Sequence, residues 1–188
     1  MRKLIVWNVI TLDGYFEGNR NWDLSFHELI WGEELEKISI EQLRSADFLV
    51  FGRLTYEGMA EYWKEAEGEG EVAELMNKIP KIVFSRTLKS VDWNNSTLYS
   101  ENASAEISRL KTLGDGDIYV FGSADLSETF MNDNLIDEYR IGIAPVISGS
   151  GRPLFRKGIS SVKLDLVSTQ QLSTGGVILR YKPKQPGN

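Results

Sequence analysis

The sequence predicts an α/β fold in which a mixed, mostly parallel sheet is flanked by helices. Short apolar runs rich in Val, Ile and Phe alternate with segments of helical periodicity, which is typical of strands connected through helices. At 188 residues the chain has the usual length of one domain. We expect a single domain over residues 1–182 and a flexible tail over residues 183–188, because prolines interrupt that last segment.

The apolar runs predict seven strands. They cover residues 3–10, 47–51, 81–84, 118–121, 138–144, 162–171 and 177–181. Connections through helices favour parallel pairing of the earlier strands. Residues 173–176 read Ser-Thr-Gly-Gly between two long alternating runs, which predicts a C-terminal β-hairpin and therefore a mixed sheet.

Helical periodicity indicates four helices, over residues 26–44, 55–63, 103–113 and 124–132. The run Ser25-Phe26-His27-Glu28 matches a capping box at the start of the first of them. Residues 64–74 combine glutamates with two glycines, so we expect a solvated acidic loop there.

Charge and composition exclude several classes of partner. The net charge is -6 and no basic run is present, which argues against nucleic-acid binding. The chain has no cysteine, so disulfides and thiolate metal sites are excluded. The apolar run near the N-terminus is too short for a signal or membrane-spanning segment. We expect a cytoplasmic protein with no membrane partner and no metal site.

Two strands end in Phe-Gly and are followed at once by a helix. The first junction reads Phe51-Gly52-Arg53-Leu54-Thr55 and the second Phe121-Gly122-Ser123-Ala124-Asp125; we call them the Gly52 bend and the Gly122 bend. Free N–H groups and the positive end of the helix dipole favour a phosphate at such a junction. Together the bends are candidates to hold a dinucleotide pyrophosphate. The alternative is that each glycine only permits a tight turn.

Arg53 and the hydroxyls of Thr55 and Ser123 favour the anion site. Ser85 and Arg86 follow another strand and suit a phosphate monoester, such as the 2′-phosphate that distinguishes NADPH from NADH. The alternative for this pair is an exposed loop.

Substrate contacts are expected near the N-terminus. Asp13 is a candidate to orient or protonate a nitrogen-rich substrate at the mouth of the pocket, although Asp-Gly is also a common turn pair. Trp7 and Trp22 are candidates to lie beside a planar ligand. His27 and Glu28 are candidate substrate contacts, with helix capping the simpler role for Glu28. A solitary histidine does not make a metal site.

Several of these motifs occur in a recognisable order. They are Thr11-Leu12-Asp13-Gly14, Phe51-Gly52-Arg53-Leu54-Thr55-Tyr56-Glu57, Phe84-Ser85-Arg86-Thr87, Phe121-Gly122-Ser123-Ala124-Asp125-Leu126, and the late runs 135–147 and 148–155. In this order the sequence resembles the dihydrofolate-reductase-like family, and most closely the C-terminal reductase domain of the bifunctional riboflavin-biosynthesis deaminase/reductase. The resemblance covers nearly the whole chain.

The resemblance implies a three-layer dihydrofolate-reductase-like fold with about eight strands, bound NADPH and a homodimer. Its cofactor contacts fall on Gly52, Arg53, Thr55, Ser85, Arg86, Gly122, Ser123, Ala124, Asp125 and Leu126. The residues that approach substrate or nicotinamide fall on Asp13, Pro145 and Gly149. Two departures are visible: the family carries Gly-Gly where this chain has Phe121-Gly122, and dihydrofolate reductases carry an acidic residue on the first helix, where the nearest residues here are His27 and Glu28.

The sequence therefore predicts an NADPH-dependent reductase that passes a hydride to a C=N or C=O carbon of a small heterocyclic substrate. By resemblance the reaction is that of 5-amino-6-(5-phosphoribosylamino)uracil reductase. Three alternatives stay open: a dihydrofolate or pterin reductase, a non-catalytic NADPH-binding module, and a nucleotide-binding subunit that holds another anion.

Overall fold

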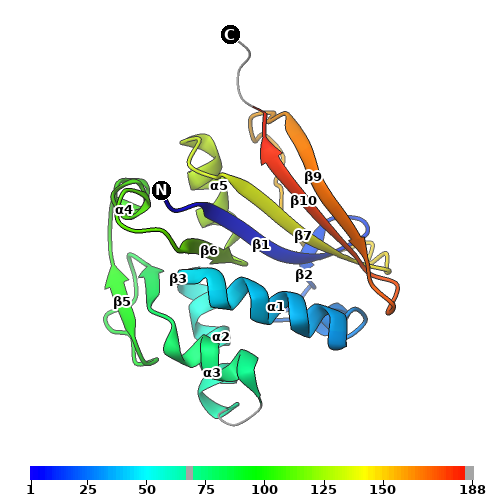
Figure 1. Cartoon of the computed structure of the whole chain (residues 1–188), viewed down its shortest axis with the longest axis horizontal. Coiled ribbons are helices and arrows are strands. Elements are labelled where there is room, and N and C mark those ends of the chain that lie inside the picture. Colours follow the sequence, from blue (N-terminus) through cyan, green and yellow to red (C-terminus); the bar gives the residue numbers. More distant parts are fainter. Residues whose placement is uncertain (67–69, 185–188) are drawn as a thin grey trace.

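A computed structural model describes residues 1–66 and 70–184. Eight strands form one sheet (Figure 1). Across the sheet they are β5 (Ser96–Tyr99), β4 (Lys81–Phe84), β3 (Ala46–Gly52), β6 (Asp117–Phe121), β1 (Leu4–Thr11), β7 (Glu138–Ala144), β10 (Val177–Pro183) and β9 (Leu164–Gln171). All neighbours from β5 to β7 are parallel, whereas β10 is antiparallel to both β7 and β9. The mixed, mostly parallel sheet with a C-terminal hairpin is thus confirmed.

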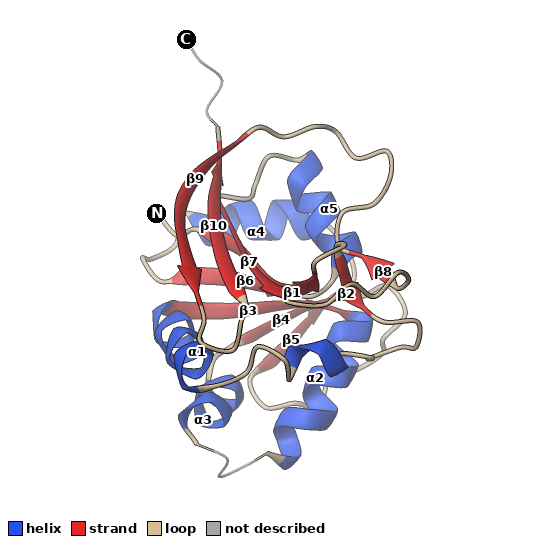
Figure 2. Ribbon diagram, turned by 90° about the vertical axis from the view of Figure 1, so that its right-hand side faces the viewer, coloured by secondary structure: helices blue, strands red, loops and turns tan. Residues whose placement is uncertain are grey.

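The helices cover the two faces of the sheet (Figure 2). On one face lie α1 (Glu33–Ser45), α2 (Arg53–Glu65) and α3 (Glu71–Lys78), and on the other α4 (Ala103–Lys111) and α5 (Ala124–Asn132). Side chains alternate along β1 accordingly. Ile5, Trp7 and Val9 belong to the core under α1, whereas Leu4 and Val6 belong to the core under α5. The predicted three layers follow from this alternation.

A second, two-stranded sheet lies where the chain leaves β1. It pairs β2 (Tyr15–Glu17) with β8 (Arg152–Pro153) in antiparallel fashion. Sequence reasoning missed both strands, because each is too short for a periodic pattern. Their pairing brings a segment that follows β1 against one that follows β7.

The first helix predicted from the sequence is wrong. Residues 26–44 do not form one helix: a single 3-10 turn, η1 (Ser25–His27), precedes α1, which begins only at Glu33. Gly32 interrupts the run in an extended conformation, and glycine is a poor helix former. A Cβ at Gly32 would come 3.3 Å from Thr174, so the C-terminal hairpin approaches the chain at this point.

The predicted capping box is also wrong. The residue before η1 receives no side-chain hydrogen bond, and the Ser25 hydroxyl lies 3.1 Å from a carboxylate oxygen of Asp23. Glu28 is exposed at the end of η1, where its backbone N–H donates to the Ser25 carbonyl at 3.3 Å.

The acidic segment 64–74 is largely helical rather than a loop. The helix α2 continues to Glu65 and α3 begins at Glu71; residues 67–69 lie outside the described part of the chain. Val72, Ala73 and Met76 give α3 a buried apolar face. Glutamates in the first turn of α3 also interact favourably with the positive end of the helix dipole. The acidic composition, which led to the prediction of a loop, is therefore compatible with a helix.

The C-terminal boundary lies later than predicted. Pro183 ends β10, paired with Leu164, and the Lys184 N–H donates to the Lys163 carbonyl at 2.8 Å. Proline is tolerated at such a strand end because it only removes a donor. The rest of the predicted tail, residues 185–188, lies outside the described residues. Sequence analysis also missed β5, whose four residues include Ser96 and Thr97.

Within residues 1–66 and 70–184, none of the helices is both long enough and apolar enough to cross a membrane. No group of three potential metal-ligating side chains comes together in the same part of the chain.

Candidate functional site

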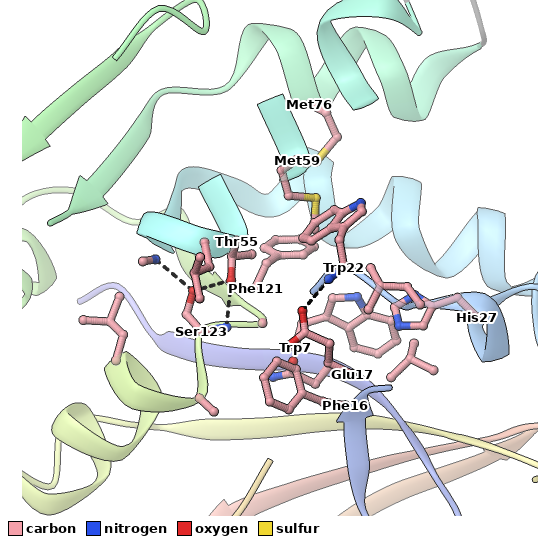
Figure 3. Close-up of a pocket in the computed structure, with 18 of the residues that line it drawn as sticks. Trp7, Phe16, Glu17, Trp22, His27, Thr55, Met59, Met76, Phe121 and Ser123 are labelled. Carbon is pink, nitrogen blue, oxygen red and sulfur yellow. Dashed lines mark hydrogen bonds between the residues drawn. The ribbon is translucent and has the colours of Figure 1, made fainter. Parts of the chain in front are cut away.

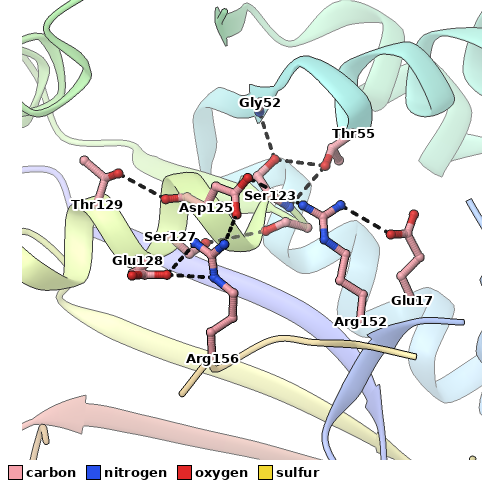
Figure 4. Close-up of polar contacts among 11 residues, drawn as sticks. Glu17, Gly52, Thr55, Ser123, Asp125, Ser127, Glu128, Thr129, Arg152 and Arg156 are labelled. Atoms are coloured by element: carbon pink, nitrogen blue, oxygen red, sulfur yellow. Dashed lines mark hydrogen bonds and ion pairs between the residues drawn. The ribbon is translucent and has the colours of Figure 1, made fainter. Parts of the chain in front are cut away.

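The two glycine bends lie side by side at one edge of the sheet. They end the adjacent parallel strands β3 and β6, and they are directly hydrogen-bonded (Figure 4). The Gly52 N–H donates to the Ser123 hydroxyl at 2.8 Å. The Ser123 N–H and hydroxyl both donate to Thr55 Oγ1, at 3.1 and 2.9 Å. The placement of both bends at one edge is therefore confirmed, and the network among them is a new observation.

The second bend has a left-handed backbone at two consecutive residues. Gly122 and Ser123 both have a φ of 53°. A Cβ on Gly122 would come 3.0 Å from the Thr55 side chain, so glycine is required both for conformation and for space. The helix α5 begins directly after Ser123, and its first residues, Ala124 and Asp125, face the same edge.

A cavity of about 490 Å³ adjoins the bends and continues along β1 (Figure 3). Pairing of β1 with β6 ends at Trp7 and Phe121, while pairing of β1 with β7 continues to Thr11 and Ala144. The last residues of β1 thus extend beyond the end of β6. Asn8 and Val9, in this overhang, line the cavity.

The cavity has two ends of different character. Thr55 and Ser123 lie on one side in Figure 3, and Trp22 and His27 on the other. The bend end is lined by Gly52, Arg53, Thr55, Gly122, Ser123, Ala124, Asp125, Leu126 and Arg152. The inner end, between the sheet and helices α1 to α3, is lined by Trp7, Trp22, His27, Trp31, Leu35, Ser39, Gln42, Leu43, Met59, Trp63, Val72 and Met76.

Charged groups gather at the bend end and are paired. Arg53 contacts Glu57 of the next turn at 3.0 Å. Arg152 lies 3.4 Å from Glu17 and 3.5 Å from Asp125. Figure 4 shows Arg152 between these two carboxylates, so the arginine joins β2 to α5. Both arginines of the described lining therefore already have carboxylate partners.

Trp22 is held over the cavity by its backbone and by α2. It has a φ of 63°, an uncommon value for a bulky residue, and its N–H donates to the Glu17 carboxylate at 2.7 Å. A Cβ on Gly58 of α2 would collide with the Trp22 indole. The glycine in the helix thus provides the surface on which this ring packs.

Two buried polar groups beside the cavity have no partner. Neither His27 Nε2 nor Asn8 Nδ2 has a hydrogen-bond partner among the described residues. Burial lowers the pKa of His27 to about 4, because desolvation disfavours the charged ring. The imidazole is therefore neutral near neutral pH. Unpaired buried polar groups cost free energy, which makes both atoms candidates for ligand contacts.

A polar network underlies the inner end. Arg140 of β7 donates to Glu138 at 2.6 Å, to the Tyr119 hydroxyl at 2.8 Å and to the side-chain oxygen of Gln42 at 3.2 Å. Gln42 is 4% exposed and lines the cavity. Since a guanidinium only donates, Arg140 fixes the oxygen of the Gln42 amide on its own side.

Most of the predicted site residues line the cavity. These are Trp7, Trp22, His27, Gly52, Arg53, Thr55, Gly122, Ser123, Ala124, Asp125 and Leu126. Their contacts with a cofactor or substrate stay predictions. Ser85 and Arg86 follow the end of β4 next to the Gly52 bend, outside the described lining; the Ser85 hydroxyl caps its own turn by accepting from the Leu88 N–H at 3.0 Å.

Asp13, predicted at the mouth of the cavity, does not belong to its described lining. Its carboxylate accepts hydrogen bonds from the Thr11 hydroxyl at 2.6 Å, the Ser148 N–H at 3.1 Å and the Gly149 N–H at 2.7 Å. These bonds, the one from Thr11 first, lower the pKa of Asp13. The carboxylate of Asp13 therefore holds the loop after β7 in place.

Glu28, Pro145 and Gly149 are exposed, and none of them belongs to the described lining. Pro145 and Gly149 belong to the loop after β7, which Asp13 holds through the Ser148 and Gly149 N–H groups. Sequence reasoning missed Glu17 and Gln42, which do line it. Their contacts join residues far apart in the chain, so no local pattern indicated them.

Known proteins with similar sequences or structures agree with this architecture. The chain matches the family described as the RibD C-terminal domain over residues 2–178. It is 31% identical over 186 residues to the "Uncharacterized protein YyaP" of Bacillus subtilis (strain 168), covering 96% of this chain and 94% of that protein.

Among solved structures, the "Putative riboflavin biosynthesis protein" of Shewanella sp. PV-4 has a TM-score of 0.77 at 22% identity, covering 97% of this chain and 99% of that one. Dihydrofolate reductase from Enterococcus faecalis, complexed with NADP(H) and RAB-propyl, has a TM-score of 0.64 at 14% identity, covering 97% of both chains. The fold is dihydrofolate-reductase-like, and the chain belongs to the RibD C-terminal domain family.

Proposed function

We propose that this protein is an NADPH-dependent reductase that transfers a hydride to a C=N or C=O carbon of a small heterocyclic compound. One observation carries the proposal: the two bends meet at the carboxyl edge of the sheet, and an aromatic cavity begins where they meet. This edge is the usual ligand position in open α/β sheets. Membership in a family of reductase domains supports the same chemistry.

The bend end offers groups that fit a dinucleotide. The left-handed Gly122 leaves backbone accessible, and the Thr55 and Ser123 hydroxyls stand beside the first turns of α2 and α5. Arg53 supplies a cation at the same place, and Arg86, just beyond β4, suits a 2′-phosphate. When bound, NADPH supplies the hydride. The protein positions the two reactants and excludes water from the inner end.

Protonation of the substrate is assigned to water. Asp13, the residue predicted for that step, is engaged by three donors that lower its pKa, and a carboxyl group that stays ionised is a poor acid. The proposed role of Asp13 is to position the loop after β7.

Cofactor titrations test the proposal. Quenching of tryptophan fluorescence should show NADPH binding more tightly than NADH, since Trp7 and Trp22 line the cavity. Arg86→Ala should remove most of the preference for NADPH, and Arg53→Ala should weaken both cofactors by about tenfold. Arg44→Ala is the control, because Arg44 is exposed and paired with Glu71, on α1 and α3 rather than in the lining.

Wild-type protein that binds neither nucleotide would refute the proposed cofactor. Unchanged NADPH affinity in both the Arg53 and the Arg86 variant would refute the proposed contacts.

A second candidate is a protein that binds NADPH without turnover. Within the described lining, both carboxylates, those of Glu17 and Asp125, are hydrogen-bonded or paired with arginine, and the imidazole of His27 is neutral. Both carboxylates are thus engaged by other groups of the protein, which favours this candidate. Consumption of NADPH with any carbonyl heterocycle, followed by its absorbance, decides between the two.

A further inference from the structure

The inner end has the walls of a site for a flat ring. The indoles of Trp7, Trp22 and Trp63 face it together with the thioethers of Met59 and Met76. Indoles stack on planar ligands, and methionine adapts to their edges. Sites of this kind bind by apolar contact and use a few polar groups to fix orientation.

Two polar side chains at this end are left for a ligand. His27 Nε2 has no partner among the described residues. The Gln42 oxygen accepts from Arg140 at 3.2 Å, so the amide NH2 is the half of that side chain turned away from Arg140. A glutamine NH2 only donates, and it therefore requires an acceptor on the ligand.

Charged side chains are concentrated at the bend end of the cavity rather than at the inner end. The lining arginines, Arg53 and Arg152, belong to the bend end, where each already contacts a carboxylate. Glu17, below Trp22, accepts from the Trp22 N–H and from Arg152. The cavity face of α1 presents Leu35, Ser39, Gln42 and Leu43. Within the described residues, the inner end thus offers no cation for a phosphate, and the carboxylate nearest to it, that of Glu17, is already engaged by the Trp22 N–H and by Arg152.

We infer that the substrate of the proposed reductase is an uncharged, unphosphorylated planar heterocycle whose ring carbonyls accept hydrogen bonds from Gln42 and His27. The inference rests on the proposed function for its chemistry, and it narrows the substrate class. It differs from the two classes that the family resemblance implied. The ribose phosphate of one would find no cation at the inner end, and the amino-substituted pterin ring of the other would find the Glu17 carboxylate already engaged by Trp22 and Arg152.

A pair of probes that differ in one group tests this inference. Lumazine carries a carbonyl where pterin carries an amino group, and both are planar. We expect lumazine to bind the wild-type protein about tenfold more tightly than pterin, as judged by tryptophan quenching. Uridine and uridine 5′-phosphate form a second pair, and the phosphate should not improve binding.

Two variants assign the contacts. Gln42→Glu keeps an oxygen for Arg140 but replaces the NH2 by an acceptor, so the order of lumazine and pterin should reverse. His27→Phe should weaken lumazine by about tenfold, and His27→Gln, which can again present an NH2, should restore part of the loss. NADPH affinity is measured in parallel and should change little in all three variants.

The two proposals fail in distinguishable ways. Pterin binding as tightly as lumazine, tighter binding of uridine 5′-phosphate than of uridine, or an unchanged order in Gln42→Glu would overturn the inferred substrate class while NADPH binding persists. If the wild-type protein does not bind NADPH, the proposed cofactor is wrong, even if lumazine binds as expected.

Discussion

The two ends of the cavity use polar groups in opposite ways. At the bend end Gly52, Thr55 and Ser123 satisfy one another, and the arginines are paired with carboxylates. At the inner end His27 Nε2 is buried without a partner, among indoles and thioethers. The bend end is thus stabilised by hydrogen bonds among its own residues, whereas His27 Nε2 at the inner end has no hydrogen-bond partner among the described residues. We therefore expect a response to pH and to tight packing from the inner end, and only the loss of local hydrogen bonds from the Ser123 network at the bend end.

The largest effect is expected from acidification, through His27. Its pKa is lowered from 6.5 to about 4 in the folded protein, so the unfolded chain takes up the proton first as the pH falls. The free energy of unfolding should therefore decrease between about pH 6.5 and about pH 4, by at most about 3 kcal/mol from this group.

Urea unfolding of the wild-type protein and of His27→Phe across that pH range measures this contribution. The variant should lose less stability on acidification, since the other titrating groups are common to both. Parallel pH profiles for the two proteins would show that His27 is not held neutral by burial.

A smaller effect is expected from Gly58→Ala. The added methyl collides with the Trp22 indole, and overpacking of this kind should lower the free energy of unfolding by about 2 kcal/mol. Glu61→Ala, at an exposed position of the same helix, is the control and should stay within about 0.5 kcal/mol. Helix propensity alone would make Gly58→Ala more stable by about 1 kcal/mol, so a stabilised variant would contradict the packing of Trp22 on α2.

The smallest effect is expected at the bend end, from Ser123→Ala. The change removes the acceptor of the Gly52 N–H and one donor to Thr55, and it should lower the free energy of unfolding by about 1 kcal/mol. Ser108→Ala, on the exposed side of α4, is the matched control. Equal stability of the two variants in urea would mean that the bends do not support each other.

Much of this molecule could be predicted from local sequence. The Phe-Gly pairs at the ends of β3 and β6 correctly predicted the two bends, and the Gly-Gly pair correctly predicted the C-terminal hairpin. The break between η1 and α1 was missed, because the approach of Thr174 to Gly32 is a tertiary contact. The contacts between Glu17 and Arg152 and between Gln42 and Arg140 join residues distant in the chain. Asp13 shows the converse: its neighbours indicated a pocket, but the loop after β7 takes its carboxylate.

The bond between Ser123 and Gly52 has a consequence for ligand affinity. An oxyanion that takes the Gly52 N–H must first displace the Ser123 hydroxyl, which already fills that position at 2.8 Å. The Ser123 hydroxyl therefore competes with the ligand for the Gly52 N–H. The free energy of the Gly52–Ser123 hydrogen bond reduces the free energy of ligand binding by the same amount. If the released hydroxyl then donates to the incoming molecule, it also gives up its bond to Thr55, so a tight complex at this edge must replace both bonds of Ser123.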